Sequence, residues 1–210
     1  GIASVNVGSE LTHVSVFSSG VPIFCKDYPL GSHHITKDLA VGLRTTQAEA
    51  ERVKREYGSA CYLPQELREV TFLQTLESTR RQVTKGEISQ IIEPRVREIF
   101  TTVRDDLEKL KIHNLLTKGV VLSGGGSQLP GLCILAEDSF DLQTRIGLPL
   151  KIAGLTEGLR SPNAAVSVGL TSSLFSDVHS TNVGRSFSKH QSSPMSFARN
   201  LFSKVRDSFR

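Results

Sequence analysis

Cysteine is scarce in this sequence, with only three residues in 210. Cys25, Cys61 and Cys133 lie far apart and lack the short spacings of metal ligands, so the sequence predicts no cysteine-based metal site. An odd number of cysteines also argues against a disulfide framework and is typical of thiols in a reducing cytosol. We therefore predict that all three side chains are small buried apolar groups.

Long hydrophobic runs are missing as well. No stretch of about eighteen apolar residues could cross a bilayer, and the N-terminus lacks the basic segment and apolar segment of a secretory signal. The chain begins with Gly1 and enters an apolar stretch at once, without an initiator methionine. We therefore expect it to be a fragment of a longer protein.

A strong excess of one charge is also absent. The 25 basic and 21 acidic residues are interspersed and leave a net charge of +4, which excludes nucleic acid as the expected partner. A hydrophobic content of 38% is enough to bury a core. The sequence is therefore that of a globular protein.

The first part of the chain predicts a meander of three strands. Residues Ile2–Val7 form an apolar run, Leu11–Phe17 alternates between apolar and polar residues, and Val21–Tyr28 continues in the same way. Turn signals at Gly8–Glu10 and Ser18–Gly20 separate the three stretches.

Two helices are predicted next. Apolar residues at helical spacing indicate a helix over His33–Leu43. A second helix begins after Thr46, which forms a capping box with Glu49 three residues further on, and ends at Gly58.

The middle of the chain predicts two more strands and a long helix. Strand-like stretches around Glu69–Leu73 and Thr79–Thr84 precede an amphipathic helix that extends to Leu110. Because Pro94 lies inside this helix and lacks a backbone donor, we expect a kink or a restart near Glu93.

A strand, a glycine turn and a helix follow as an α/β unit. Gly119–Ser123 reads as a short buried strand, Gly124–Gly126 as the turn, and Gly131–Phe140 as the helix. Leu150–Ala153 is predicted to be a last strand. Pro162–Phe175 is rich in small residues and is predicted to be a helix that packs tightly against a sheet.

The end of the chain predicts a linker and an amphipathic helix. Residues 176–194 contain almost no large apolar side chains, so we expect a flexible linker, and residues 195–210 repeat apolar residues every four positions. The expected membrane-binding side chains are Phe197, Leu201, Phe202, Val205 and Phe209, with Arg199 and Arg206 beside them for anionic lipid. A helix that docks into a protein groove would use the same pattern.

Two short motifs could bind a nucleoside. The bare backbone of Gly124–Gly126, after a buried strand and before a helix, lets a flat ligand approach closely, although a simple tight connection would look the same. Glu51 and Lys54 lie three residues apart on one helix face and could hold the two hydroxyls of a ribose. An ordinary solvated salt bridge is the alternative for that pair.

These motifs occur in the order found in actin-like ATPases, namely a phosphate hairpin, a Glu-x-x-Lys helix and an apolar strand that ends in Gly-Gly. The chain more closely resembles the FtsA family of bacterial cell-division proteins over nearly its whole length except the linker. The segments that carry the resemblance are Gly31–Leu43 (GSHHITKDLAVGL), Ala48–Gly58 (AEAERVKREYG), Ile92–Arg95 (IEPR) and Arg145–Gly147 (RIG).

The resemblance implies an α/β fold, the C-terminal half of an actin-like (ribonuclease H-like) protein with a smaller inserted α/β lobe and a C-terminal amphipathic helix. The large lobe would comprise residues 1–45 and 113–175, and the inserted lobe residues 46–112. Residues 176–194 would be the linker and residues 195–210 the membrane-targeting helix.

The resemblance also implies a binding site for ATP with Mg. The implied contacts are Gly8 and Ser9 in the phosphate hairpin, Glu51 and Lys54 at the ribose, and Gly124, Gly125, Gly126 and Ser127 at the adenosine. The hairpin departs from the family pattern Asp-x-Gly-Gly-Gly-Thr, because Asn6 lacks the carboxylate that organises the metal and Glu10 adds a negative charge. We therefore predict weakened nucleotide binding, no catalytic residue, no metal ligand and no ATP turnover.

The partners implied by the resemblance are the FtsZ C-terminal peptide, an anionic membrane surface, other divisome proteins and further copies in a filament. Arg95 matches a family contact for the acidic FtsZ peptide, although it could also be a solvated helix charge. The implied role is a scaffold, not an enzyme, that tethers FtsZ polymers to the cytoplasmic face of the inner membrane at the division site. The alternatives are a truncated actin-superfamily kinase and a pilus-assembly ATPase relative.

Overall fold

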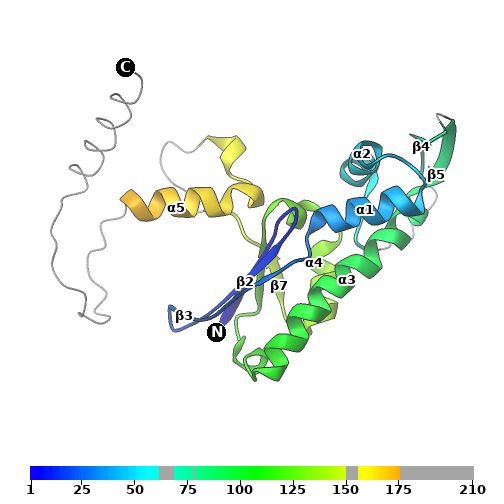
Figure 1. Cartoon of the computed structure of the whole chain (residues 1–210). Coiled ribbons are helices and arrows are strands. Elements are labelled where there is room, and N and C mark those ends of the chain that lie inside the picture. The colour runs from blue at the N-terminus through cyan, green and yellow to red at the C-terminus, as the bar shows by residue number, and fades with distance from the viewer. Residues whose placement is uncertain (62–68, 78, 150–155, 176–210) are drawn as a thin grey trace, which may run out of the picture. The chain divides into compact units, whose positions relative to one another are not determined.

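The computed structural model describes residues 1–61, 69–77, 79–149 and 156–175 (Figure 1). The predicted strand Leu150–Ala153, the linker 176–194 and the amphipathic helix 195–210 lie outside the described residues. No helix in the described ranges has both the length and the apolar character needed to cross a bilayer.

Five strands form the main sheet, in the order β3-β2-β1-β6-β7. β1 pairs antiparallel with β2, and β2 pairs in the same way with β3, whereas β6 and β7 add on the other side of β1 as parallel strands. The strands are β1 (Ile2–Val7), β2 (Thr12–Ser18), β3 (Val21–Tyr28), β6 (Val120–Ser123) and β7 (Thr144–Ile146). The predicted three-strand meander is confirmed, whereas β7 was not predicted.

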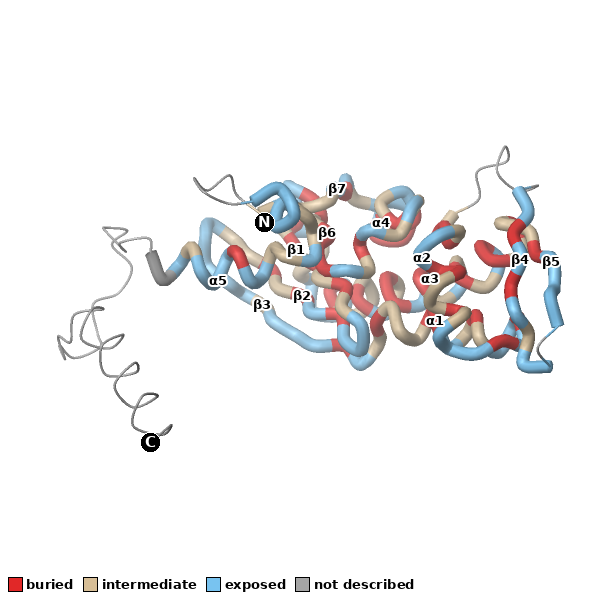
Figure 2. Tube along the Cα trace, turned by 90° about the horizontal axis from the view of Figure 1, so that it is seen from above, coloured by how far each residue is buried: buried red, intermediate tan, exposed pale blue. Residues whose placement is uncertain are grey.

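The hairpin between β2 and β3 is closed by Ser19 and Gly20, both with positive φ (51° and 81°). Such turns match the twist of paired antiparallel strands, which explains the sharp reversal here. β3 is the edge strand and is largely exposed, as its pale colour in Figure 2 shows. Cys25 on this strand is therefore exposed, and Cys61 and Cys133 are half-buried, so the prediction of three buried cysteines is wrong.

One face of the sheet is covered by helices α3 (Lys85–Lys109) and α4 (Leu132–Phe140) (Figure 1). Alternate residues of β1, namely Ala3, Val5 and Val7, are buried, and so are Val14 and Leu122 on the neighbouring strands. Phe100 of α3 and Phe140 of α4 contribute rings whose centroids lie 5.4 Å apart. The period of two along each strand places this apolar set on a single face.

A second, two-stranded antiparallel sheet consists of β4 (Val70–Gln74) and β5 (Arg80–Thr84), as predicted. The helices are α1 (Ser32–Gly42), α2 (Gln47–Tyr57), α3 (Lys85–Lys109), α4 (Leu132–Phe140) and α5 (Ala165–Phe175). Four short 3-10 turns are η1 (His113–Leu115), η2 (Gly125–Gln128), η3 (Glu157–Leu159) and η4 (Pro162–Ala164).

Helix α2 begins and ends as predicted, with the Thr46 hydroxyl accepting the Glu49 backbone N–H and Gly58 as the C-cap. Helix α3 starts with a full capping box between Thr84 and Glu87 that was not predicted.

A kink or a restart was predicted near Glu93. The restart does not occur, because α3 runs without interruption from Lys85 to Lys109 through Pro94. Buried side chains on both sides of the proline, such as Ile92 and Val96, keep the helix on the core. A proline inside a helix costs about 3 kcal/mol through the lost hydrogen bond and the clash of its ring. Burial of several apolar side chains, at about 1.5–3 kcal/mol each, offsets that cost.

The predicted tight packing of the last helix against a sheet is wrong. Val168 of α5 is buried, but Val166 and Leu170 are exposed. The apolar residues of α5 are spread around the helix instead of forming one stripe, so no single face is directed to the core.

Candidate functional site

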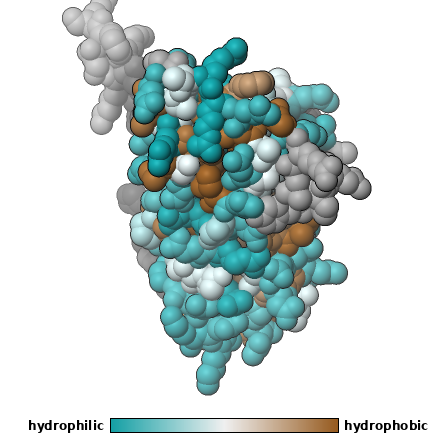
Figure 3. Space-filling model, turned by 90° about the vertical axis from the view of Figure 1, so that its right-hand side faces the viewer, coloured by the Kyte–Doolittle hydropathy of each residue, from teal (hydrophilic) through white to brown (hydrophobic). Residues whose placement is uncertain are grey.

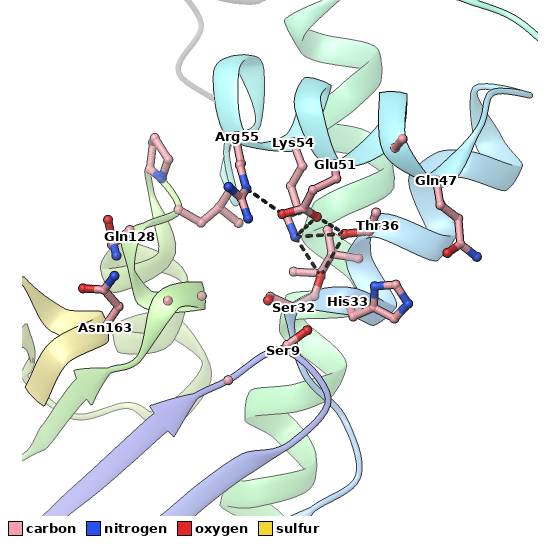
Figure 4. A pocket seen from close by; sticks show the side chains of 17 residues that line it. Ser9, Ser32, His33, Thr36, Gln47, Glu51, Lys54, Arg55, Gln128 and Asn163 are labelled. Atoms are coloured by element: carbon pink, nitrogen blue, oxygen red, sulfur yellow. Dashed lines mark hydrogen bonds and ion pairs between the residues drawn. The ribbon is translucent and has the colours of Figure 1, made fainter. Parts of the chain in front are cut away.

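A cavity of about 830 Å³ is formed where the turn after β1, the helices α1 and α2, the η2 region and η4 meet. Figure 4 shows the side chains that point into it. The turn after β1 contributes Gly8 and Ser9. The other lining residues are Ser32, His33, Ile35 and Thr36 from α1; Gln47, Ala48, Glu51, Lys54 and Arg55 from α2; and Gly125, Gly126, Gln128, Leu129, Pro130 and Asn163 from η2 and the segments beside it.

Glu51 and Lys54 form the centre of a bonded network on the α2 side. Lys54 is buried, and its Nζ lies 2.6 Å from Oε2 of Glu51. The same ammonium donates to Oγ1 of Thr36 at 2.9 Å and to the backbone carbonyl of Ser32 at 3.1 Å. Thr36 in turn donates to Glu51 at 2.6 Å. The pair is therefore more than the solvated salt bridge that was its alternative, because it joins α2 to α1.

The network controls the charge of Glu51. Burial acts to raise the pKa of this carboxyl, but hydrogen bonds from Lys54, Thr36 and Arg55 outweigh it and lower the pKa to about 2. Arg55 donates from Nε to the second carboxylate oxygen at 2.7 Å. Glu51 is therefore ionised at neutral pH. Its Oε1 accepts from Arg55, which leaves one lone pair of that oxygen for a ligand hydroxyl group.

The glycine turn is shaped by its backbone. Gly124 has φ of +85°, a conformation that side chains disfavour, and its N–H donates to the carbonyl of Pro162 at 2.9 Å. A Cβ built on Gly125 would have no atom within 4 Å, so this residue faces open space in the cavity. A Cβ on Gly126 would lie 2.5 Å from Cγ1 of Val7. A flat ligand can therefore approach the turn on the side of Gly125.

Some of the predicted site residues line the cavity and others do not. Gly8, Ser9, Glu51, Lys54, Gly125 and Gly126 all line the cavity. Gly124 and Ser127 do not, because the buried Ser127 hydroxyl donates to the Gly124 carbonyl at 2.8 Å and stabilises the turn itself.

The turn that connects β1 to β2, Gly8–Leu11, is attached to the start of α1. The backbone N–H groups of Ser32 and His33 donate to the carbonyls of Gly8 and Ser9, at 2.9 and 2.8 Å. Two of the N–H groups that a helix start usually offers to anions are therefore already used. Glu10 is largely exposed, with Oε1 3.9 Å from Nε2 of His33.

The described residues of the cavity do not fit a magnesium ion. The Asn6 side chain donates its amide to Oγ of Ser123 at 3.2 Å, and both oxygens of Glu51 are engaged by protein groups. In the described part of the chain, no group of three or more His, Cys, Asp or Glu side chains could hold a metal ion. Magnesium prefers carboxylate and water oxygens in octahedral geometry, which this wall does not supply.

Arg95, the predicted partner-binding residue, lies outside the cavity on α3. Its guanidinium makes a bidentate pair with Asp38 of α1, at 2.6 and 3.0 Å, and a second pair with Glu98 at 2.5 Å. Hydrogen bonding to Asp38 is the main cause that raises the pKa of Arg95. Its side chain is 26% exposed, so it can still be reached from solvent.

Several site residues were not found from the sequence. Ser32 and Thr36 contribute through the network, and His33 lines the cavity. The i, i+4 spacing of Ser32 and Thr36, at the start of a helix that directly follows the hairpin, could have indicated the first two. Arg55 lies four residues after Glu51 and could have been found by the same rule.

Solved structures with the same fold define the class of protein. The ADP-bound MreB5 of Spiroplasma citri matches with a TM-score of 0.66 at 19% identity, over 81% of this chain and 52% of that one. The type IV pilus biogenesis complex PilM–PilN matches with a TM-score of 0.59 at 22% identity, over 81% of this chain and 45% of that one. These likenesses show the fold alone. The chain thus has the predicted actin-like fold.

Sequence comparison identifies the family within that class. The model of the family described as "Cell division protein FtsA" matches residues 3–169. The FtsA protein of Bacillus subtilis (strain 168) is 37% identical over 173 residues, which cover 81% of this chain and 38% of that protein. The chain therefore belongs to the FtsA family, and it spans well under half the length of this relative. Family membership favours a cell-division role over a kinase or a pilus-assembly ATPase.

Proposed function

We propose that the chain is part of a cell-division scaffold that tethers FtsZ polymers to the cytoplasmic face of the inner membrane at the division site. The observation that carries the proposal is the family match over residues 3–169, which includes every element of the cavity. The proposed role needs three surfaces, one for lipid, one for the FtsZ peptide and one for a nucleotide. It also includes contacts with other divisome proteins and with further copies of the chain in a filament.

The proposed lipid surface is the segment 195–210, on the strength of its sequence pattern. Phe202 belongs to the apolar face, whereas the neighbouring Ser203 is polar. We expect the full chain to sediment with anionic vesicles, and expect Phe202→Asp to abolish this because a carboxylate would enter the acyl region. Ser203→Asp adds the same charge at the next position and serves as the control. Equal sedimentation of the full chain and a chain without residues 195–210 would contradict the proposal.

The proposed FtsZ surface includes Arg95. Because Asp38 and Glu98 already contact this guanidinium, an acidic peptide must share it or displace them. Exposed apolar side chains also occur on the same lobe, at Phe72 and Leu76. Figure 3 shows hydrophobic patches among hydrophilic side chains on the end of the molecule that carries β4 and β5.

The peptide test compares two paired arginines of the same helix. Arg97 pairs with Glu93 and Asp138, at 3.0 and 2.7 Å. We expect Arg95→Gln to weaken binding of a synthetic FtsZ C-terminal peptide about tenfold, as for loss of one charge-assisted hydrogen bond. Arg97→Gln should leave binding within about twofold. If the two variants weaken binding equally, Arg95 has no special role.

The proposed nucleotide surface is the cavity, which would hold the adenosine part of ATP between the glycine turn and Glu51. MreB5 of Spiroplasma citri has been solved bound to ADP and bound to AMPPNP. In this chain, Gly125 leaves room for a flat ring and Glu51 can accept hydroxyl hydrogen bonds. The metal of an ATP–Mg complex would need ligands from beyond the described residues.

We propose a scaffold without ATP turnover. The purified chain should release no phosphate from ATP above the rate of a buffer blank. Gly125→Val should abolish adenosine binding, measured by calorimetry, because the added side chain fills the cavity. Steady phosphate release would overturn the scaffold role, and adenosine binding by Gly125→Val would overturn the placement of the ligand.

A further inference from the structure

The charged side chains of the cavity are few and are used by one another. Two cations, Lys54 and Arg55, and one anion, Glu51, are the lining residues with formal charge at neutral pH. Both cations contact the same carboxylate, on its two oxygens. The lining therefore has a formal charge of +1, in a network that is already satisfied.

Glu10 adds a negative charge at the edge of the cavity. It is not a lining residue and is largely exposed, but its Oε1 lies 3.9 Å from Nε2 of His33, a residue of the cavity wall, and it follows Ser9, which also lines the cavity. Its carboxylate would therefore offset the remaining positive charge for a ligand group that reaches the hairpin side. Two helix-start N–H groups that could have offset it, at Ser32 and His33, are occupied by the hairpin carbonyls.

The rest of the lining carries no formal charge and includes both polar side chains and the apolar residues Ile35, Ala48, Leu129 and Pro130. Hydroxyl groups of Ser9 and Ser32 and carboxamide groups of Gln47, Gln128 and Asn163 face the cavity (Figure 4). Such groups suit the hydroxyls of a sugar and the edge of a base, but provide no compensation for several phosphate charges.

We propose that this cavity selects nucleosides and nucleotides with few phosphate charges over nucleoside triphosphates, and that Glu10 is the residue that sets this selectivity. The proposal rests on the proposed function, because it assumes that the cavity binds a nucleoside. The proposal adds to that function the class of ligand that binds best and the residue, Glu10, that sets the preference. The preferred order is adenosine or AMP first, then ADP, then ATP.

The test measures binding of adenosine, AMP, ADP and ATP to the full 210-residue chain by calorimetry, first with EDTA and then with magnesium. Glu10→Gln keeps the shape of the side chain and removes its charge. One nearby unit charge changes affinity about fivefold in water and more where screening is weaker. We expect Glu10→Gln to improve ATP binding about five- to tenfold and to change adenosine binding less than twofold. Magnesium should reduce the improvement, because it neutralises part of the ATP charge.

Asp27→Asn is a matched control. Asp27 also pairs with a histidine, His13, and its side chain is 62% exposed, as is that of Glu10. Neither carboxylate lines the cavity, but Glu10 adjoins the wall residues Ser9 and His33, whereas Asp27 lies on β3 and its partner His13 is not a wall residue. The variant changes the net charge by the same amount, so ATP binding should stay within about twofold if the effect of Glu10 is local.

The outcomes separate the two proposals. If adenosine binds but ATP binds more tightly, and Glu10→Gln changes nothing, the selectivity is overturned while the nucleoside site stands. An equal gain in ATP binding for Glu10→Gln and Asp27→Asn would also overturn it, because net charge alone would explain the gain. If none of the four ligands binds, the nucleotide part of the proposed function fails and the selectivity fails with it.

Discussion

The two sides of the cavity are built in different ways. On the α2 side, Lys54 is buried, and every polar group around it has a short hydrogen bond within the protein. On the hairpin side, Glu10 is exposed and lies 3.9 Å from its partner His33. The comparison indicates that the α2 side is part of the folded core, whereas the charge of the hairpin side can change without affecting folding.

The largest expected effect is on the α2 side. Lys54→Met removes the ammonium and leaves Thr36 and the Ser32 carbonyl without their partner, so we expect the free energy of unfolding to fall by about 3 kcal/mol. Arg55→Met removes an exposed partner of the same carboxylate and should cost less than about 0.5 kcal/mol. Urea denaturation measures both, and equal losses would show that the core network has no special weight.

Lowering the pH should remove the stabilisation that ionised Glu51 provides through its contacts with Lys54, Thr36 and Arg55. Because the pKa of Glu51 is lowered from 4.5 to about 2 in the folded state, its contribution is complete above pH 4.5 and is lost as the pH falls toward 2. One pKa unit is about 1.4 kcal/mol, and partial exposure reduces the total to about 2 kcal/mol. The stability difference between the wild type and Glu51→Gln should therefore be largest at pH 6 and should shrink at pH 2.5. A difference that does not depend on pH would argue against an ionised Glu51.

The glycine turn allows the effect of an added methyl group on stability to be compared at two adjacent residues, Gly125 and Gly126. Gly126→Ala should destabilise the protein by about 1–2 kcal/mol, because the new methyl group would lie 2.5 Å from Val7 Cγ1. Gly125→Ala meets no atom within 4 Å and should change stability by less than about 0.5 kcal/mol. Thermal denaturation of the two variants checks which of the two glycines has room for a side chain, and the reverse ranking would contradict the assignment.

The smallest effect is expected on the hairpin side. Glu10→Gln should change the free energy of unfolding by less than about 0.5 kcal/mol, because exposed ion pairs contribute little. The same urea experiment measures it. A loss as large as that of Lys54→Met would show that the two sides do not differ as described.

Local patterns predicted much of the fold. The alternation in Leu11–Phe17 and the Thr46–Glu49 cap act within a few residues, and both were found from the sequence. β7 was missed because three residues with Arg145 at the centre show no alternation. The restart at Pro94 was predicted from a local rule, but burial of the helix on both sides of the proline outweighs that rule.

The site was predicted less completely, for a physical reason. Glu51 and Lys54 share one turn of a helix, so their spacing alone placed them together. Thr36 joins them only because α1 lies against α2, which no local pattern in the sequence encodes. The sequence showed that Glu10 departs from the glycine-rich pattern of the family's phosphate hairpin. The position of the Glu10 side chain beside His33, however, depends on how the hairpin meets α1.

Because the hairpin turn is hydrogen-bonded to the start of α1, the exchange of two amide protons measures how often the turn detaches. The Ser32 and His33 N–H groups are bonded to the Gly8 and Ser9 carbonyls, and not to groups within their own helix. Their exchange with deuterium requires the loop to detach, whereas the amides further along α1 exchange when the helix itself opens. The ratio of the exchange rate observed at Ser32 and His33 to the intrinsic rate of an unprotected amide therefore gives the free energy of loop release in the absence of any ligand.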